Sequence, residues 1–116
     1  MQRQRLIIGV SGSSAPHLAF ATLKALHNHP EIETHLVVSN GADKTIEFEM
    51  GASRADFEAL ADVFYHPDNF AAAISSGSFR TLGMAVVPCS MKTLANLATG
   101  NVNDLLTRAA DVCLKE

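Results

Sequence analysis

The chain has 116 residues, a formal net charge of −3 and 47% hydrophobic residues. This length is typical of one domain, 1–116, and the weak acidic charge argues against nucleic-acid binding, which calls for a basic face. No apolar run approaches the roughly 18 residues needed to cross a bilayer, and the run at 6–10 is too short for a signal peptide. We therefore expect a cytoplasmic protein that binds neither nucleic acid nor membrane.

Strands and helices are predicted to alternate along the sequence. Residues 6–10 predict a strand that is apolar on both faces, as strands of a parallel sheet are. Pro16 suits the first turn of the following helix, because its missing N–H costs nothing there, and Ser53 is placed to cap a short helix. In chain order, we expect a strand at 6–10, a helix at 15–28, a strand at 33–38, helices at 42–49 and 53–60, a strand at 63–66, a helix at 67–74, a strand at 83–87, and helices at 90–98 and 102–115.

This alternation predicts the architecture. The strands lie too far apart in sequence for hairpins, so they should form a parallel sheet with right-handed crossovers. We predict an α/β fold with a three-layer, doubly wound parallel sheet. Residues 102–115 carry an apolar stripe, yet the sequence ends at Glu116, where a fifth strand would begin. We expect a fragment that lacks its C-terminal strand or strands, because exposed edges and apolar stripes promote aggregation.

Two strand-to-helix junctions carry residues suited to an anion or a nucleotide. Ligands of an open parallel sheet bind beyond the carboxyl ends of its strands. The junction at 9–15 is rich in glycine and serine and opens a helix, which favours phosphate. Its spacing matches neither the P-loop nor the dinucleotide motif, so a capped tight turn remains an equal interpretation. The second junction follows Pro88 and carries Cys89, Ser90, Lys92 and Thr93.

The end of the second predicted strand bears on the kind of nucleotide. A dinucleotide site has an acidic residue there to hold the ribose hydroxyls. Here Ser39 and Asn40 occupy the position, and Asp43 falls inside the next helix. A mononucleotide such as FMN needs no such acid, so the sequence disfavours NAD.

Several other polar residues have both a functional and a structural interpretation. Arg108, Asp111 and Lys115 share one face of the last predicted helix, where the two cations could converge on a phosphate or form a solvated face with an Arg108–Asp111 pair. Glu49 could be an acid or base, or a surface carboxylate. Cys89 is expected to be a structural thiol, because no base accompanies it. The five histidines show no metal-ligand spacing, so no metal site is predicted.

Taken together, these segments resemble the UbiX-type flavin prenyltransferases, a family long described as aromatic-acid decarboxylase subunits. The resemblance runs through essentially the whole chain and keeps its segments in order. The matching blocks are Gly-Val-Ser-Gly-Ser-Ser (9–14), Glu-Thr-His-Leu-Val-Val-Ser (33–39), Ile-Ser-Ser-Gly-Ser-Phe-Arg-Thr-Leu-Gly-Met (74–84), Pro-Cys-Ser-Met-Lys-Thr-Leu-Ala (88–95) and Leu-Leu-Thr-Arg-Ala-Ala-Asp-Val-Cys-Leu-Lys-Glu (105–116).

The resemblance implies a flavodoxin-like or Rossmann-like fold, FMN as the cofactor and a homo-oligomer, a dodecamer in the family. It implies transfer of a dimethylallyl group from dimethylallyl phosphate to reduced FMN without a metal. The prenylated flavin would then serve a UbiD-type decarboxylase. One alternative is the related FMN-dependent cysteine decarboxylases, although His17 is poorly placed for their catalytic histidine. Another is an inactive FMN-binding fragment.

The resemblance also implies roles for individual residues. The FMN-binding set is Gly12, Ser13, Ser14, Ser39, Ser90, Met91, Lys92, Thr93 and Arg108. The set that would bind the phosphate of dimethylallyl phosphate is Ser14, Arg108 and Lys115. The catalytic set is Glu49, Ser14 and Lys115, with Glu49 as the acidic residue near the transferring group.

The sequence departs from the family pattern in three places. Ala15 stands where the family's first loop usually has glycine, and Asn40 stands where a basic residue often follows the serine. The family's C-terminal third, which brings an Arg-Glu pair and a Tyr to the site, has no counterpart in this sequence. We expect the site to be half built and the 116-residue chain alone to be inactive.

Overall fold

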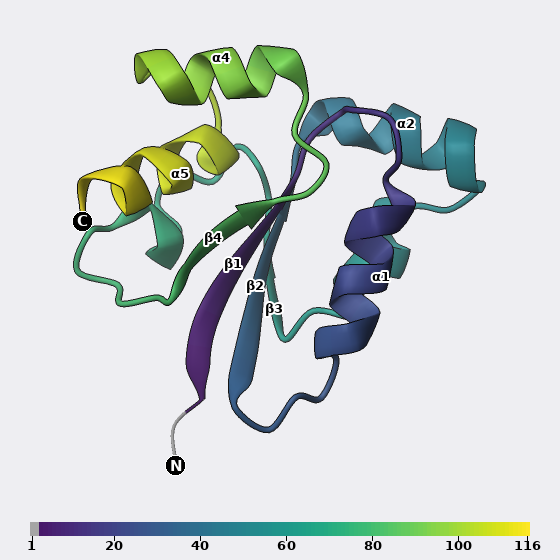
Figure 1. The fold of residues 1–116 in the computed structure, drawn as a ribbon, viewed down its shortest axis with the longest axis horizontal. Helices are drawn as coiled ribbons and strands as arrows, with labels where there is room; N and C mark the ends of the chain where they lie inside the picture. The colour runs from purple at the N-terminus through teal and green to yellow at the C-terminus, as the bar shows by residue number, and fades with distance from the viewer. Residues whose placement is uncertain (1–2) are drawn as a thin grey trace.

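A computed structural model describes residues 3–116 of the chain (Figure 1). Four parallel strands form one sheet in the order β3-β2-β1-β4. In chain order the elements are β1 (Gln4–Val10), α1 (His17–Leu26), β2 (Ile32–Val38), α2 (Asn40–Met50), α3 (Arg54–Glu58), β3 (Val63–Tyr65), the 3-10 helix η1 (Ala73–Ser75), β4 (Gly83–Val86), α4 (Met91–Thr99) and α5 (Leu105–Lys115). The α/β fold with a parallel sheet is confirmed.

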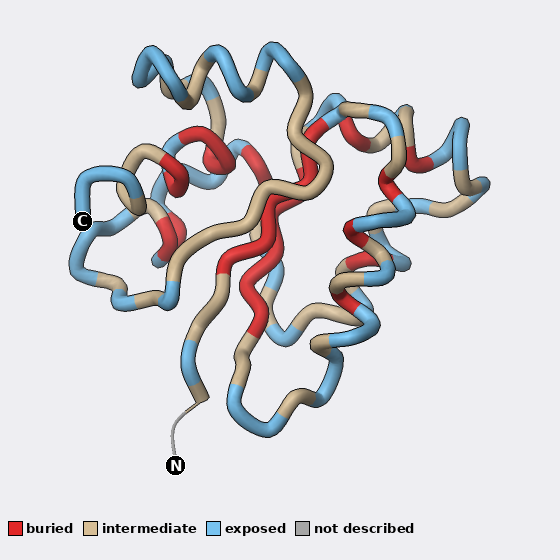
Figure 2. The backbone as a smooth tube through the Cα atoms, viewed as in Figure 1, coloured by how far each residue is buried: buried red, intermediate tan, exposed pale blue. Residues whose placement is uncertain are grey.

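Helices cover both faces of the sheet, and the alternation of side chains along each strand explains the two cores. Ile8 and Leu36 face α1, α2 and α3, whereas their neighbours Ile7 and Val37 face η1 and α5. All four residues are almost completely buried. Figure 2 shows buried segments in the middle of the sheet and in the helices on both of its sides. Figure 1 shows α1 and α2 on one side of the sheet and α5 on the other, which is the predicted three-layer arrangement.

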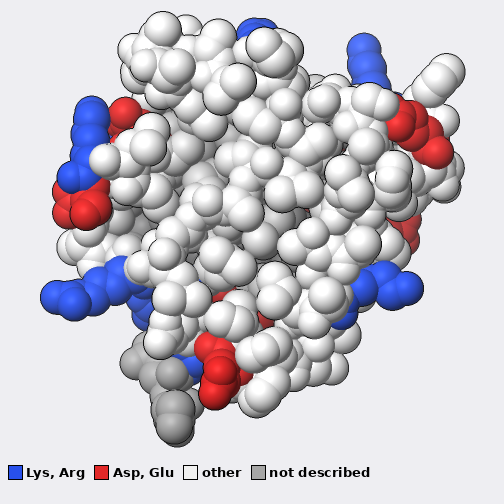
Figure 3. Space-filling model, viewed as in Figure 1, with Lys and Arg blue, Asp and Glu red and all other residues white. Residues whose placement is uncertain are grey.

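Strand β4 and helix α4 are the least covered elements. Strand β4 pairs with β1 alone among the described strands, and each of its residues is half-buried. Helix α4 has no buried residue, and its Met91 is 78% exposed. Figure 3 shows that charged side chains lie mainly near the outline of this view. This side of the protein therefore presents mostly uncharged atoms to solvent.

One predicted helix does not form, and two helices begin two or more residues later than predicted, each for a local reason. The helix expected at 67–74 is a series of turns that ends in η1, because the His66 ring and the Asn69 amide accept hydrogen bonds from nearby backbone N–H groups. Helix α1 begins two residues late, since Ala15 has a left-handed φ of 70°. Helix α5 begins at Leu105, because Asp104 caps it.

Asp62 ties the end of α3 to strand β2. Its Oδ2 accepts hydrogen bonds from the backbone N–H of Thr34 at 2.8 Å and from the Thr34 hydroxyl at 3.3 Å, and its Oδ1 pairs with Arg3 at 3.2 Å. Burial alone would raise the pKa of Asp62, but these hydrogen bonds and the Arg3 charge outweigh it and leave the pKa below 3.8. The charged carboxylate of Asp62 therefore stabilises the folded state.

We expect Asp62→Asn to lower the free energy of unfolding by about 1 kcal/mol at pH 7. Because the pKa of Asp62 is lower in the folded state, its stabilisation is complete at neutral pH and is lost as the pH falls through the folded pKa, below about pH 4. The difference between variant and wild type should therefore shrink in urea unfolding at pH 3. The exposed Asp68→Asn is the control, and an equal loss in both variants at pH 7 would contradict the assignment.

Candidate functional site

The residues predicted at the two junctions meet in a pocket of about 500 Å³ beyond the carboxyl ends of the strands. Its lining consists of Gly12, Ser39, Asn40, Gly41, Asp68, Ser90, Lys92, Thr93, Asn96, Asn103, Asp104 and Thr107. Five of these belong to the predicted FMN-binding set: Gly12, Ser39, Ser90, Lys92 and Thr93. The structure therefore brings together segments that are far apart in sequence.

The β1–α1 loop lies directly on the first turn of α2. A Cβ added at Gly12 would come within 3.0 Å of the carbonyl carbon and oxygen of Gly41. The Thr45 hydroxyl donates to the Gly12 carbonyl oxygen at 3.0 Å. Ser39 caps α2, because its Oγ accepts the N–H of Ala42. Where Gly12 and Gly41 line the pocket, the lining is therefore backbone rather than side chain.

Ser11 joins the two junctions, and sequence reasoning missed it. Its hydroxyl donates to the Pro88 carbonyl oxygen at 2.7 Å and accepts the N–H of Ser90 at 2.7 Å. Ser90 in turn caps α4, since its Oγ accepts the N–H of Thr93 at 3.1 Å. The available signal was a serine directly after an apolar strand. A hydroxyl at such a position is buried, as Ser11 is, and needs a hydrogen-bond partner.

Glu49 and Ser14, two residues of the predicted catalytic set, are in contact. The Glu49 Oε1 accepts hydrogen bonds from the Ser14 hydroxyl at 3.2 Å and from the Ala15 backbone N–H at 3.1 Å. Ala15 has a left-handed φ of 70°, a backbone conformation that favours glycine. Helix α2 therefore places a carboxylate against the loop that follows β1.

Ser13 and Met91 belong to the predicted FMN-binding set but are outside the pocket lining. Ser13 is half-buried in the β1–α1 loop, and Met91 is exposed at the first position of α4. Both lie next to residues that do line the pocket, Gly12 and Lys92. Their contact with a cofactor stays a prediction.

Arg108 and Lys115 lie on α5, on the opposite face of the sheet from Ser14 and Glu49. The Arg108 Nε donates to the Ser75 carbonyl oxygen at 3.3 Å. Lys115 pairs with Asp111 at 3.0 Å, whereas one of the two interpretations of this face paired Asp111 with Arg108. Their role in binding a substrate phosphate stays a prediction, and within one chain they do not contact the Ser14–Glu49 pair.

The two thiols and the groups of possible metal ligands are the other candidates for a reactive centre. Burial raises the pKa values of Cys89 and Cys113, so both are protonated at neutral pH. Within residues 3–116, no group of three or more His, Cys, Asp and Glu side chains is arranged to hold a metal ion. No helix in this part of the chain is long and apolar enough to cross a membrane.

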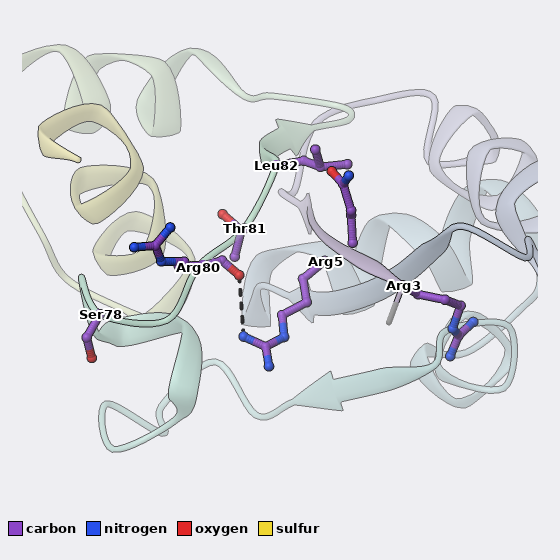
Figure 4. A pocket seen from close by; sticks show the side chains of 7 residues that line it. Arg3, Arg5, Ser78, Arg80, Thr81 and Leu82 are labelled. Atoms are coloured by element: carbon purple, nitrogen blue, oxygen red, sulfur yellow. Dashed lines mark hydrogen bonds between the residues drawn. The ribbon is translucent and has the colours of Figure 1, made fainter. Parts of the chain in front are cut away.

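A second hollow, of about 620 Å³, lies at the amino ends of the strands (Figure 4). Its lining is Arg3, Gln4, Arg5, Ser78, Arg80, Thr81 and Leu82. Arg5 stacks 4.0 Å over the Phe79 ring, and Arg3 pairs with Asp62. Figure 4 shows the guanidinium groups of Arg3, Arg5 and Arg80 pointing apart. These cations do not converge on one point, so the pocket at the carboxyl ends remains the candidate site.

Comparison with known protein families decides the assignment. The flavoprotein family matches residues 1–116, the whole chain. The chain belongs to the flavoprotein family. A probable UbiX-like flavin prenyltransferase of Sedimentibacter hydroxybenzoicus is 56% identical over 112 residues, which are 97% of this chain and 59% of that protein. The flavin prenyltransferase UbiX of Escherichia coli (strain K12) is 48% identical over 113 residues, 97% of this chain and 60% of that protein.

Solved structures agree with this flavoprotein assignment. AnUbiX (PadA1), in complex with FMN and dimethylallyl pyrophosphate, matches with a TM-score of 0.94 and 44% identity over 99% of this chain and 61% of its own. A dodecameric FMN-dependent UbiX-like decarboxylase from Escherichia coli O157:H7 matches with a TM-score of 0.94 and 52% identity, over 97% of this chain and 62% of its own.

These relatives confirm the resemblance to UbiX-type proteins. The alternative family is more distant, since the FMN-dependent cysteine decarboxylase TvaF is 14% identical with a TM-score of 0.76 and shares the fold alone. The flavoprotein chain spans about 60% of the length of the curated UbiX relatives it matches.

Proposed function

We propose that this chain binds FMN in the pocket beyond the carboxyl ends of its strands and belongs to a flavin prenyltransferase. The reaction would move a dimethylallyl group from dimethylallyl phosphate to reduced FMN. The observation that carries the proposal is the junction pocket itself, in which Gly12, Ser39, Ser90 and Lys92 converge. The similarity to AnUbiX, solved with FMN and dimethylallyl pyrophosphate, supports it.

The residues present fit a flavin phosphate on one side of the pocket. Lys92 lies in the first turn of α4, next to the helix N-terminus that Ser90 caps, and both features favour an anion. Asp68 and Asp104 also line the pocket, and their carboxylates would repel a phosphate. We therefore place the phosphate toward α4, with the Gly12 backbone against the cofactor.

Reduced FMN, when bound, supplies the nucleophile to which the dimethylallyl carbon bonds. The chain's part is to help the phosphate leave and to exclude water from the allylic cation that remains. In this proposal, Ser14 donates a hydrogen bond to the phosphate oxygens of the substrate. Glu49, whose Oε1 accepts the Ser14 hydroxyl at 3.2 Å in the free chain, accepts or returns a proton at that oxygen.

Arg108 and Lys115 are proposed to neutralise the leaving phosphate. Both lie on the sheet face opposite Ser14, so in this proposal they act on a site shared between copies of the chain. The dodecameric structure of a relative supports such an assembly. We further propose that the protein is cytoplasmic. A UbiD-type decarboxylase would receive the prenylated flavin, and residues 1–116 would form one FMN-binding unit.

Anaerobic incubation of the protein, extended beyond Glu116 to the length of its relatives, with reduced FMN and dimethylallyl phosphate tests the proposal. The readout is mass spectrometry of the extracted flavin. We expect FMN that has gained one dimethylallyl group, and free inorganic phosphate in equal amount. Uptake of FMN without this product would favour the alternative, an FMN-binding chain without transferase activity. A folded protein that takes up no FMN would overturn both.

A further inference from the structure

We propose that Arg54 is a positioning residue for the FMN pocket, which it braces from outside through Asp43 and Ser39. None of the sequence patterns assigned a role to Arg54, and it does not line the pocket. The inference rests on the proposed binding of FMN. It adds a residue that would set cofactor affinity without touching the cofactor.

Arg54 holds the first turn of α2 with a two-pronged contact. Its Nε donates to Asp43 Oδ1 at 2.9 Å, and its Nη2 donates to Asp43 Oδ2 at 2.8 Å. The same Nη2 lies 3.4 Å from the Ser39 carbonyl oxygen. The Arg54 side chain is 18% exposed, and that of Asp43 is 45% exposed. A fork of this geometry fixes orientation as well as distance, which a single ion pair does not.

The element that carries Arg54 is itself fixed. Helix α2 ends at Gly51 with a left-handed φ of 61°, and the chain then reverses into α3. Ser53 and Asp56 form a capping box at the start of α3. Phe57, fully buried, packs edge-on against Phe20 of α1 at 5.2 Å between ring centroids. Arg54 therefore reaches back to α2 from a helix anchored in the core.

The braced turn is the one on which the β1–α1 loop rests. Gly41 in this turn approaches Gly12 so closely that a Cβ on Gly12 would lie 3.0 Å from its backbone. One turn further along, Thr45 donates to the Gly12 carbonyl oxygen. A shift of the first turn of α2 would therefore move Ser39, Gly41 and Gly12 together. All three line the pocket.

The test measures FMN dissociation constants by flavin fluorescence for the wild type and three variants. Arg54→Gln and Asp43→Asn each break the fork, and we expect each to weaken FMN binding about three- to tenfold. The matched control is Lys44→Gln, which removes one positive charge from an exposed neighbour and should change the constant less than twofold. At saturating FMN, the visible circular dichroism of the bound flavin should change in Arg54→Gln but not in the control.

The two single variants also separate positioning from simple charge. If Arg54 acted only by neutralising Asp43, then Asp43→Asn would bind FMN as well as the wild type or better, and this result would overturn the inference. The double variant should be no weaker than either single variant, because both remove one shared contact. Wild-type protein that binds no FMN would refute the proposed function instead, so the two failures are distinguishable.

Discussion

Gly12→Ala is expected to weaken FMN binding more than tenfold and to lower the free energy of unfolding by about 1–3 kcal/mol. The added Cβ would lie 3.0 Å from the backbone carbon and oxygen of Gly41, and backbone cannot rotate aside as a side chain can. Either the β1–α1 loop or the first turn of α2 must move. Both carry residues of the pocket lining, so stability and affinity should fall together.

Gly41→Ala is the matched control, because it adds the same methyl group to the other side of the contact. Its Cβ would meet nothing closer than 3.9 Å, and Gly41 lies in the first turn of α2. Alanine favours a helix over glycine by about 1 kcal/mol, so this variant should be as stable as the wild type or more so. Flavin titration of Gly12→Ala measures its affinity. Chemical unfolding of both variants provides the measurement of stability, because Gly41 itself lines the pocket and its substitution is a clean control for stability alone. Equal losses of stability in the two variants would show that the Gly12–Gly41 contact is not the cause.

The sequence was sufficient to predict the sheet and the place of the pocket. The apolar runs of β1 and β2 are buried on both faces. Such a run predicts a strand of a parallel sheet without any knowledge of the elements that pack against it. Once a parallel sheet is predicted, the polar residues that follow the strands must gather at one edge. Ser39 and Ser90 are found there as helix caps, in agreement with their position after strands.

The contacts that shape the pocket could not be predicted in the same way. The fork between Arg54 and Asp43 depends on how sharply the chain turns at Gly51, and Ser11 meets Ser90 across 79 residues. Periodicity carries no information about such pairs. The helix expected at 67–74 failed because short polar side chains there satisfy the backbone locally, which competes with helix formation.

Glu49→Gln is expected to lower the rate of dimethylallyl transfer by about 10²–10⁴-fold while leaving the FMN dissociation constant within twofold of wild type. The amide of glutamine can still accept the Ala15 N–H, so the loop after β1 should keep its place. It cannot accept a proton from the Ser14 hydroxyl or from the leaving phosphate. Single-turnover assays with bound reduced FMN separate this chemical step from cofactor binding.

Glu47→Gln supplies the control, because it removes the same charge from the same helix at an exposed position two residues earlier. It should transfer the group at the wild-type rate, whereas Ser14→Ala should lower the rate, since its hydroxyl is the partner of Glu49. If Glu49→Gln and Glu47→Gln retained similar rates, the 3.2 Å contact would be part of the loop's structure alone. The proton would then have to be handled by a group other than Glu49.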